Sequence, residues 1–428
     1  MSQGRKAGLL LIFVTVFIDL LGFGIVLPLL PRYGEHFEAG GGTLGLLMAS
    51  FSAMQFLFAP IWGRLSDRVG RRPILILGLA GSTIFYGMFG FATSLGKEGM
   101  FLGIGALSWL FTTRIGAGIA GATIPTAQAY IADITGPKER GKGMALIGAA
   151  FGIGFTFGPL IGAAFVSSEV GATPSAAPGY VACVLSGIAA LLSIFMLPES
   201  LSKEKSNSLS KRLHWFDINS FRHALTRPQI GLILFTIFLT TFAFAQFEST
   251  LSLLTQELGF AARSNFYVFA YIGLILTLSQ GILVRRLIPR IGEYRMGMAG
   301  IILMVAGLLL IGVAGNSGSY ALLYAVLPIS VVGFSATTPS LQSLLSLNTP
   351  DDEQGGVLGV GQSISALARI LGPLAGIVLF KGTQNGLIPG SINSPYYVGA
   401  GIMLMGLLLM SGLKSKTTNS DSTAKSDT

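Results

Sequence analysis

Charged residues are scarce in this sequence. Only 11% of its 428 residues are Asp, Glu, Lys or Arg, whereas a typical soluble domain carries about 25%. Apolar residues make up 51% of the chain, and its mean hydropathy is +0.69. This composition excludes an ordinary soluble domain and predicts a membrane protein. The length suits about a dozen spans of about 20 residues each.

Cysteine and histidine are nearly absent. The single cysteine, Cys183, excludes an intrachain disulfide and a cysteine-based metal cluster, and its apolar surroundings predict a buried, inert thiol. Neither an H-x-H pair nor an acidic cluster accompanies the three histidines. The sequence also lacks the G-x-x-x-x-G-K-[ST] loop that cradles nucleotide phosphates. We therefore expect no metal site, no cofactor, no direct use of ATP and no enzymatic activity.

Twelve apolar runs follow one another along the chain and predict an all-α polytopic membrane protein with twelve transmembrane helices. The runs lie at residues 9–30, 43–63, 73–92, 101–121, 143–166, 178–197, 229–254, 264–288, 294–314, 320–345, 355–380 and 395–413. The longest polar stretch, at 198–228, predicts a linker between two six-helix bundles at 1–197 and 229–413. The tail at 414–428 is rich in Ser, Thr, Asp and Lys and is predicted to be disordered.

The basic residues are distributed unevenly over the predicted loops. The formal net charge of +9 does not predict a nucleic-acid partner, because the basic residues lie between apolar runs rather than on one soluble face. With the N-terminus inside the cell, the outer loops hold only Arg32, Lys97, Arg263 and Lys381, while Arg114 and Arg369 fall within spans. The rest of the 28 Lys and Arg residues then face the interior. The positive-inside rule thus predicts a multi-pass protein of the plasma or inner membrane, with the linker and both termini in the cytoplasm.

The second half of the chain repeats the first at an offset of 214 residues. This offset places Pro125 on Pro339, Gln128 on Gln342, and Gly158-Pro159 on Gly372-Pro373. Both copies start on the same side of the membrane after six spans, so the repeat is parallel. Two parallel six-helix repeats around a central cavity can rock against each other and expose a midplane site to either side in turn.

The segment Gly63–Arg72 (GRLSDRVGRR) resembles the loop between helices 2 and 3 of the major facilitator superfamily (MFS), G-x-L-x-D-R-x-G-R-R. The matching residues are Gly63, Leu65, Asp67, Arg68, Gly70, Arg71 and Arg72. The resemblance implies a transporter in which this loop is a cytoplasmic gate. Asp67, paired with Arg68 or Arg71 and with a neighbouring helix N-terminus, would then hold the outward-facing state. The simpler alternative is that the arginines only anchor helix ends at lipid headgroups. A degenerate copy at Gly281–Arg295 has no matching aspartate and predicts a weaker second gate.

Two further motifs resemble those of MFS carriers. The first, L-x-x-x-R-x-x-x-G, places Arg114 inside the fourth run. The second, G-x-x-x-G-P-x-x-G, comprises Gly154, Gly158, Pro159 and Gly162 and resembles the helix 5 motif of drug–proton antiporters. Together with the stretch IDLLGFGIVLPLLP, these motifs make the chain similar to the twelve-helix, tetracycline-efflux-type carriers. Ordinary helix packing is the alternative role for the helix 5 motif.

Two acidic residues lie inside apolar runs, Asp19 in the first and Glu248 in the seventh. A carboxylate at the centre of a bilayer costs about 3 kcal/mol on insertion scales, so it needs a cation, a proton or water. We expect Arg114 to partner Asp19 and this pair to couple transport to protons, with Glu248 as a second coupling residue. The alternatives are a permanent structural ion pair and, for Glu248, a solvated charge near a helix end with Arg369 as a possible partner.

Several glutamines also lie inside apolar runs, where their amides either line a substrate cavity or hold helices together. The cavity candidates are Gln55, Gln128, Gln246, Gln342 and Gln362. Gln128 and Gln342 occupy matching positions of the repeat and are expected to face the cavity symmetrically.

The sequence as a whole predicts a monomeric MFS transporter that exports a small, amphipathic, drug-like molecule in exchange for protons. Its partners are then the substrate, protons and the bilayer, and the proton gradient takes the place of a cofactor. One alternative is an MFS importer or symporter of a metabolite. The other is a non-transporting receptor or scaffold with the MFS fold, which would have no need of Asp67 or the buried charges.

Overall fold

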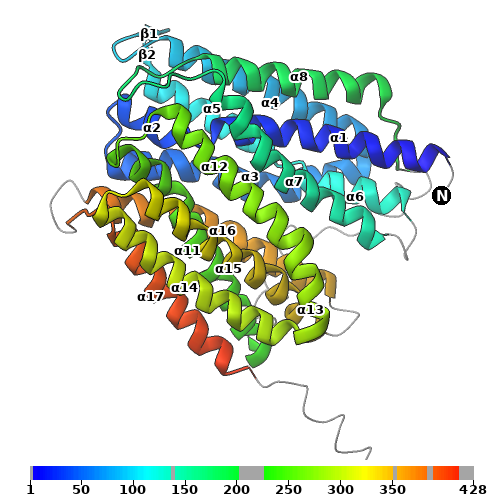
Figure 1. Ribbon diagram of the computed structural model, residues 1–428. Coiled ribbons are helices and arrows are strands. Elements are labelled where there is room, and N and C mark those ends of the chain that lie inside the picture. Colours follow the sequence, from blue (N-terminus) through cyan, green and yellow to red (C-terminus); the bar gives the residue numbers. More distant parts are fainter. Residues whose placement is uncertain (1–2, 136–139, 202–225, 350–353, 383–388, 414–428) are drawn as a thin grey trace, which may run out of the picture.

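The computed structural model describes residues 3–135, 140–201, 226–349, 354–382 and 389–413, and these are mostly helical (Figure 1). Apolar runs become helices in a bilayer because every backbone N–H and C=O must be bonded without water. Within these described ranges, ten helical segments are long and apolar enough to cross a membrane. The other two predicted spans, at 101–121 and 143–166, correspond to α5 and to α7, and α6 continues the chain beyond the first of them.

The first half comprises α1 (Gln3–Val26), α2 (Leu30–His36), α3 (Gly41–Val69), α4 (Arg71–Ser94), the antiparallel pair β1 (Met100–Phe101) and β2 (Ile104–Gly105), α5 (Ala106–Ala120), α6 (Ile124–Ile134), α7 (Arg140–Ala163) and α8 (Ala177–Met196). The second half comprises α11 (Pro228–Glu257), α12 (Ala262–Leu278), the π-helix η1 (Ser279–Val284), α13 (Arg285–Ile291), α14 (Glu293–Ser317), α15 (Tyr320–Leu347), α16 (Gln354–Lys381) and α17 (Ser394–Ser411).

The segment predicted as a loop at 63–72 is almost entirely helical. α3 continues through Val69 and α4 begins at Arg71, so only Gly70 separates them. Gly70 has φ of 112°, and a Cβ atom built on it would lie 2.3 Å from the Glu199 carboxylate. Only glycine fits this reversal, because an L side chain would be strained and would also clash.

The helices of each half pack together, and the halves meet where α7 packs against α12 and α3 against α16 (Figure 1), with a smaller contact between α2 and α11. Polar contacts between the halves gather at one end of the molecule, where α2 and the turn between α11 and α12 lie; we call this the α2 end. The predicted domain boundaries stay predictions. Residues 202–225 of the predicted linker and the predicted tail at 414–428 lie outside the described residues.

Candidate functional site

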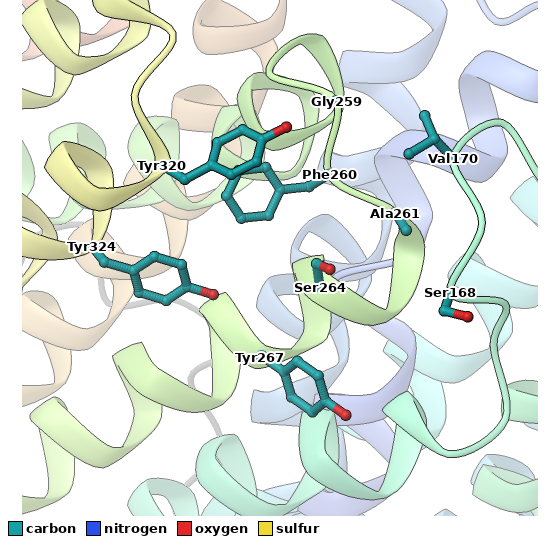
Figure 2. A pocket seen from close by; sticks show the side chains of 9 residues that line it. All are labelled: Ser168, Val170, Gly259, Phe260, Ala261, Ser264, Tyr267, Tyr320 and Tyr324. Carbon is teal, nitrogen blue, oxygen red and sulfur yellow. The ribbon is translucent and has the colours of Figure 1, made fainter.

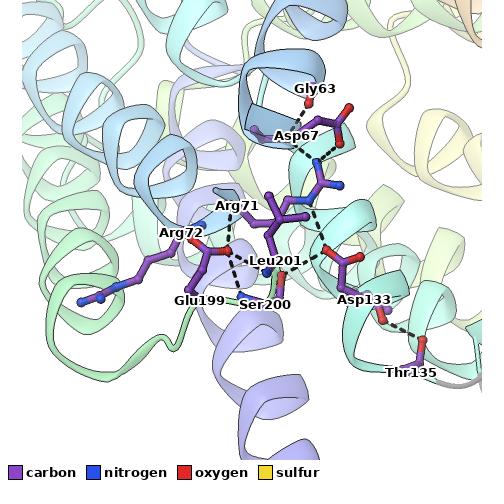
Figure 3. A network of polar contacts seen from close by, with 11 residues as sticks. Gly63, Asp67, Arg71, Arg72, Asp133, Thr135, Glu199, Ser200 and Leu201 are labelled. Atoms are coloured by element: carbon purple, nitrogen blue, oxygen red, sulfur yellow. Dashed lines mark hydrogen bonds and ion pairs between the residues drawn. The ribbon is translucent and has the colours of Figure 1, made fainter. Parts of the chain in front are cut away.

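The arginine-rich segment forms a polar network in the first half, at the end opposite α2 (Figure 3). Nη1 of Arg71 lies 2.5 Å from Oδ1 of Asp67, and its Nε lies 3.2 Å from Oδ2 of Asp133 on α6. Nη1 also donates to the Ser66 hydroxyl at 2.7 Å. Arg71 is only 6% exposed, so these partners offset the cost of removing its charge from water. Of the two expected partners of Asp67, Arg71 is therefore confirmed, and the role of Asp67 as a gate stays a prediction.

Glu199, just after α8, holds the start of α4 in place (Figure 3). Its carboxylate accepts hydrogen bonds from the backbone N–H groups of Arg71 at 2.9 Å and of Arg72 at 3.1 Å. These N–H groups lie in the first turn of α4, where they have no partner within the helix and where negative charge is favoured. The carboxylate at the N-terminus of α4 thus belongs to Glu199, and the expected contact of Asp67 with a neighbouring helix N-terminus stays a prediction.

Asp19 lies inside the first span and is half-buried. The Ser186 hydroxyl on α8 donates to its Oδ1 at 3.4 Å, and the Ser82 hydroxyl on α4 is a second hydrogen-bond partner. Asp19 therefore joins three helices of the first half through polar bonds within the apolar interior.

The expected ion pair between Asp19 and Arg114 does not form. Arg114, on α5, is 2% exposed, and its guanidinium lies over the Phe51 ring of α3, with 4.4 Å from Cζ to the ring centroid. Tyr86 on α4 lies within electrostatic range of both charges. The prediction fails because α4 and α8 supply Asp19 with hydroxyl groups, whereas α5 directs Arg114 toward Phe51.

Glu248 on α11 and Arg369 on α16 are close enough for their charges to attract each other, but they do not form an ion pair. Glu248 is half-buried and lies nine residues before the end of α11 at Glu257, about two and a half helical turns inside. The Arg369 side chain is exposed. Arg369 is therefore an electrostatic partner of Glu248, as expected, but the two side chains are not in direct contact.

The predicted cavity glutamines fall into two groups. Gln246 is 1% exposed and donates to the Pro395 carbonyl at 2.5 Å, so it joins α11 to α17 and does not line a cavity. Gln55 is half-buried and donates to the Gly121 carbonyl at 3.2 Å. Gln128, Gln342 and Gln362 are exposed. That Gln128 and Gln342 face the cavity symmetrically stays a prediction.

The helix 5 motif packs closely against neighbouring helices. Cβ atoms built on Gly154 and Gly158 would lie 3.0 Å from Leu20 and 2.9 Å from Gly24, both on α1. One built on Gly162 would lie 2.5 Å from Phe266 of α12 in the other half. Pro159 is within α7. These contacts favour the packing role that the sequence left as an alternative.

Three of the four basic residues predicted in outer loops bridge the halves at the α2 end. Arg32 donates to the Phe260 carbonyl at 2.8 Å and to Thr255 at 2.9 Å. Arg263 donates to the carbonyls of Ala163 and Val166 at 3.1 and 3.0 Å. Lys381 forms an ion pair with Glu35. From the sequence these residues were identified only as the few basic residues of the outer loops, and the sequence did not predict that they bridge the halves.

A cavity of about 340 Å³ is lined in part by Phe260, whose carbonyl accepts from Arg32 (Figure 2). Its walls come from the connection after α7 and from α12 and α15, and they include Tyr267, Tyr320 and Tyr324. Tyr267 and Tyr320 are about half exposed, as expected of amphipathic rings near a membrane surface.

Cys183, predicted to be buried, is a free and half-buried thiol.

Comparison with known proteins agrees with this geometry. The family model described as "Major Facilitator Superfamily" matches residues 12–373. A class E tetracycline resistance protein of Escherichia coli is 31% identical, with 93% of each chain covered. Multidrug resistance protein 2 of Bacillus subtilis is 27% identical, with 96% of each covered. The crystal structure of the human organic anion transporter MFSD10 (TETRAN) superposes with a TM-score of 0.67 at 26% identity, covering 95% of this chain and 99% of that one.

Proposed function

This chain belongs to the Major Facilitator Superfamily, and we propose that it exports a small, amphipathic, drug-like molecule in exchange for protons. It is a multi-pass membrane transporter with the twelve-helix fold of the superfamily. We propose that it works as a monomer, uses the proton gradient without a cofactor, catalyses no reaction and binds no nucleic acid.

The surroundings of Asp19 are the observation that supports proton coupling. It is a half-buried carboxylate inside a span, and its direct bonds come from neutral hydroxyl groups rather than from a cation. A carboxylate inside a span needs a cation, a proton or water, and neither of these two direct bonds comes from a cation. Proton binding at Asp19 would then be sensitive to the opening and closing of the halves. Glu248, which faces Arg369 electrostatically, is the second proposed coupling residue.

The charge distribution supports an orientation in which the α2 end lies outside the cell and both termini lie inside. In that orientation the bridges of Arg32, Arg263 and Lys381 would close the outer side, and we propose that the structure corresponds to an inward-facing state. The Asp67–Arg71 network then lies at the cytoplasmic side, where we propose that it gates the opposite, outward-facing state.

The relatives' names support drug-like cargo. Those in Escherichia coli and Bacillus subtilis are named for tetracycline and multidrug resistance, and the human structure is titled an organic anion transporter. We propose an amphipathic molecule of this general kind, for which both anionic and cationic members need to be tested.

Transport by purified protein in liposomes tests the proposal. With the lumen acidic, and transporters inserted so that their outer face meets the lumen, protons leaving should drive a tetracycline or a lipophilic cation inward. Collapse of the gradient should stop this accumulation. Asp19→Asn should lower the gradient-driven accumulation at least about tenfold, whereas gradient-independent exchange should persist. Movement of cargo in the same direction as protons would establish an importer instead, and movement of no compound would favour a receptor or scaffold.

A further inference from the structure

Arg114 is a buried cation without a direct polar partner. It makes no hydrogen bond or ion pair with any residue that the structure describes, and its Nε is completely enclosed. A guanidinium carries five N–H donors, and removing it from water is costly unless anions or acceptors meet them. Its guanidinium lies over the face of the Phe51 ring in a cation–π contact, which satisfies none of these donors.

The other arginines that join helices in this structure are engaged. Arg71 meets two carboxylates, and Arg32 donates to a carbonyl and a hydroxyl. Arg369, the other arginine inside a span, faces Glu248. Arg114 therefore differs from the rest, and Asp19, the acid expected to pair with it, is bonded to Ser82 and Ser186 instead.

Aromatic rings adjoin this unused cation. Phe51, which stacks on Arg114, also stacks on Phe23 of α1, with 5.1 Å between the ring centroids. Phe23 in turn meets Phe155 of α7 edge-on at 5.7 Å, and both of these rings are half-buried. The site thus combines rings that can stack on a flat apolar body with donors suited to a carboxylate or phenolate.

We propose that Arg114 is the counter-ion for an acidic oxygen of the cargo, so that the preferred cargo is an aromatic anion. This proposal rests on the proposed export function and specifies the substrate class for it. Phe23 and Phe51 would hold the aromatic body, and the guanidinium would bind its carboxylate or phenolate. Asp19 is then free to take up and release the coupling proton, which separates the cargo site from the proton site.

Equilibrium binding to the detergent-purified protein tests this proposal without a proton gradient. The probes are three naphthalenes that differ in charge: 1-naphthoate, the neutral 1-naphthamide and the cationic 1-naphthyltrimethylammonium. We expect naphthoate to bind the wild-type protein at least about 30-fold more tightly than naphthamide, because a desolvated guanidinium without an anion is strongly disfavoured. Tighter binding of the amide or of the cation, or binding of none of the three, would overturn the proposal. The wild-type measurement holds whether or not variants fold.

Variants then locate the preference. Arg114→Gln should abolish the advantage of naphthoate over naphthamide, while Arg369→Gln, which removes an intramembrane arginine already facing a carboxylate, should keep it. An anion preference that survives Arg114→Gln would place the anion elsewhere and refute the assignment. Failure of gradient-driven transport with a retained anion preference would refute the proposed export and not this site. Transport of cations alone, with Arg114→Gln unaffected, would refute the site and leave export standing.

Discussion

Lys381 at the end of α16 forms an ion pair with Glu35 on α2, and this pair joins the two halves of the molecule. Their side chains are only 23% and 20% exposed, so the pair is screened less than a surface pair. We expect Lys381→Glu to destabilise the closed α2 end by about 1 kcal/mol and to reduce the ratio of closed to open molecules about fivefold.

Distances between spin labels at Glu98 and Ser317, one in each half, would measure this shift in a Cys183→Ser background. Both label sites are exposed at the α2 end and lie outside the bridges. The double exchange Glu35→Lys with Lys381→Glu should restore the wild-type distances. An unchanged distance distribution in Lys381→Glu would show that the pair contributes nothing to closure.

Asp67→Asn is expected to lower transport at least about tenfold while leaving insertion and yield unchanged. Asparagine keeps the shape of Asp67 but removes the charge that meets Arg71, and Asp133 still satisfies Nε of that arginine. Export into everted vesicles, normalised to the amount of protein in the membrane, would measure the effect. Glu98→Gln, at an exposed residue, is the control and should transport at the wild-type rate. Transport by Asp67→Asn at the wild-type rate would contradict a gating role.

The spans and the parallel repeat could be predicted, because hydropathy and internal similarity are properties of the sequence itself. The Asp67–Arg71 pair followed from the resemblance of 63–72 to the MFS loop, although that segment is helical and not a loop. Asp133 and Glu199 could not be assigned as partners of Arg71, since they lie 62 and 128 residues away and reach it only through the packing of α6 and the end of α8. The Asp19–Arg114 pair was predicted wrongly for a related reason. Depth in the membrane can be estimated from the sequence, but the rotation of each helix about its axis is set by packing.

Glu199→Gln should lower the thermal stability of the protein. The substitution removes the negative charge that caps the first turn of α4, and a capping contact of this kind contributes about 1 kcal/mol. For a chain of this size we expect the apparent Tm to fall by about 2 °C. Fluorescence-detected size-exclusion after heating would measure it. Glu169→Gln, at an exposed glutamate in the connection after α7, should leave the Tm unchanged, and equal Tm values for both variants would argue against a capping role.

Gly158→Ala tests whether the helix 5 motif is a packing surface. A Cβ atom on Gly158 would lie 2.9 Å both from Cα of Gly24 and from the Leu21 carbonyl, so α7 would have to move away from α1. Such overpacking costs about 1–3 kcal/mol, and we expect an apparent Tm lower by several degrees. Gly401→Ala in α17 is the matched control, because no atom lies within 4 Å of its added Cβ. Its Tm should stay the same or rise slightly, since alanine favours helix more than glycine does. If Gly158→Ala keeps the wild-type Tm but loses transport, the motif acts in the transport cycle rather than in packing.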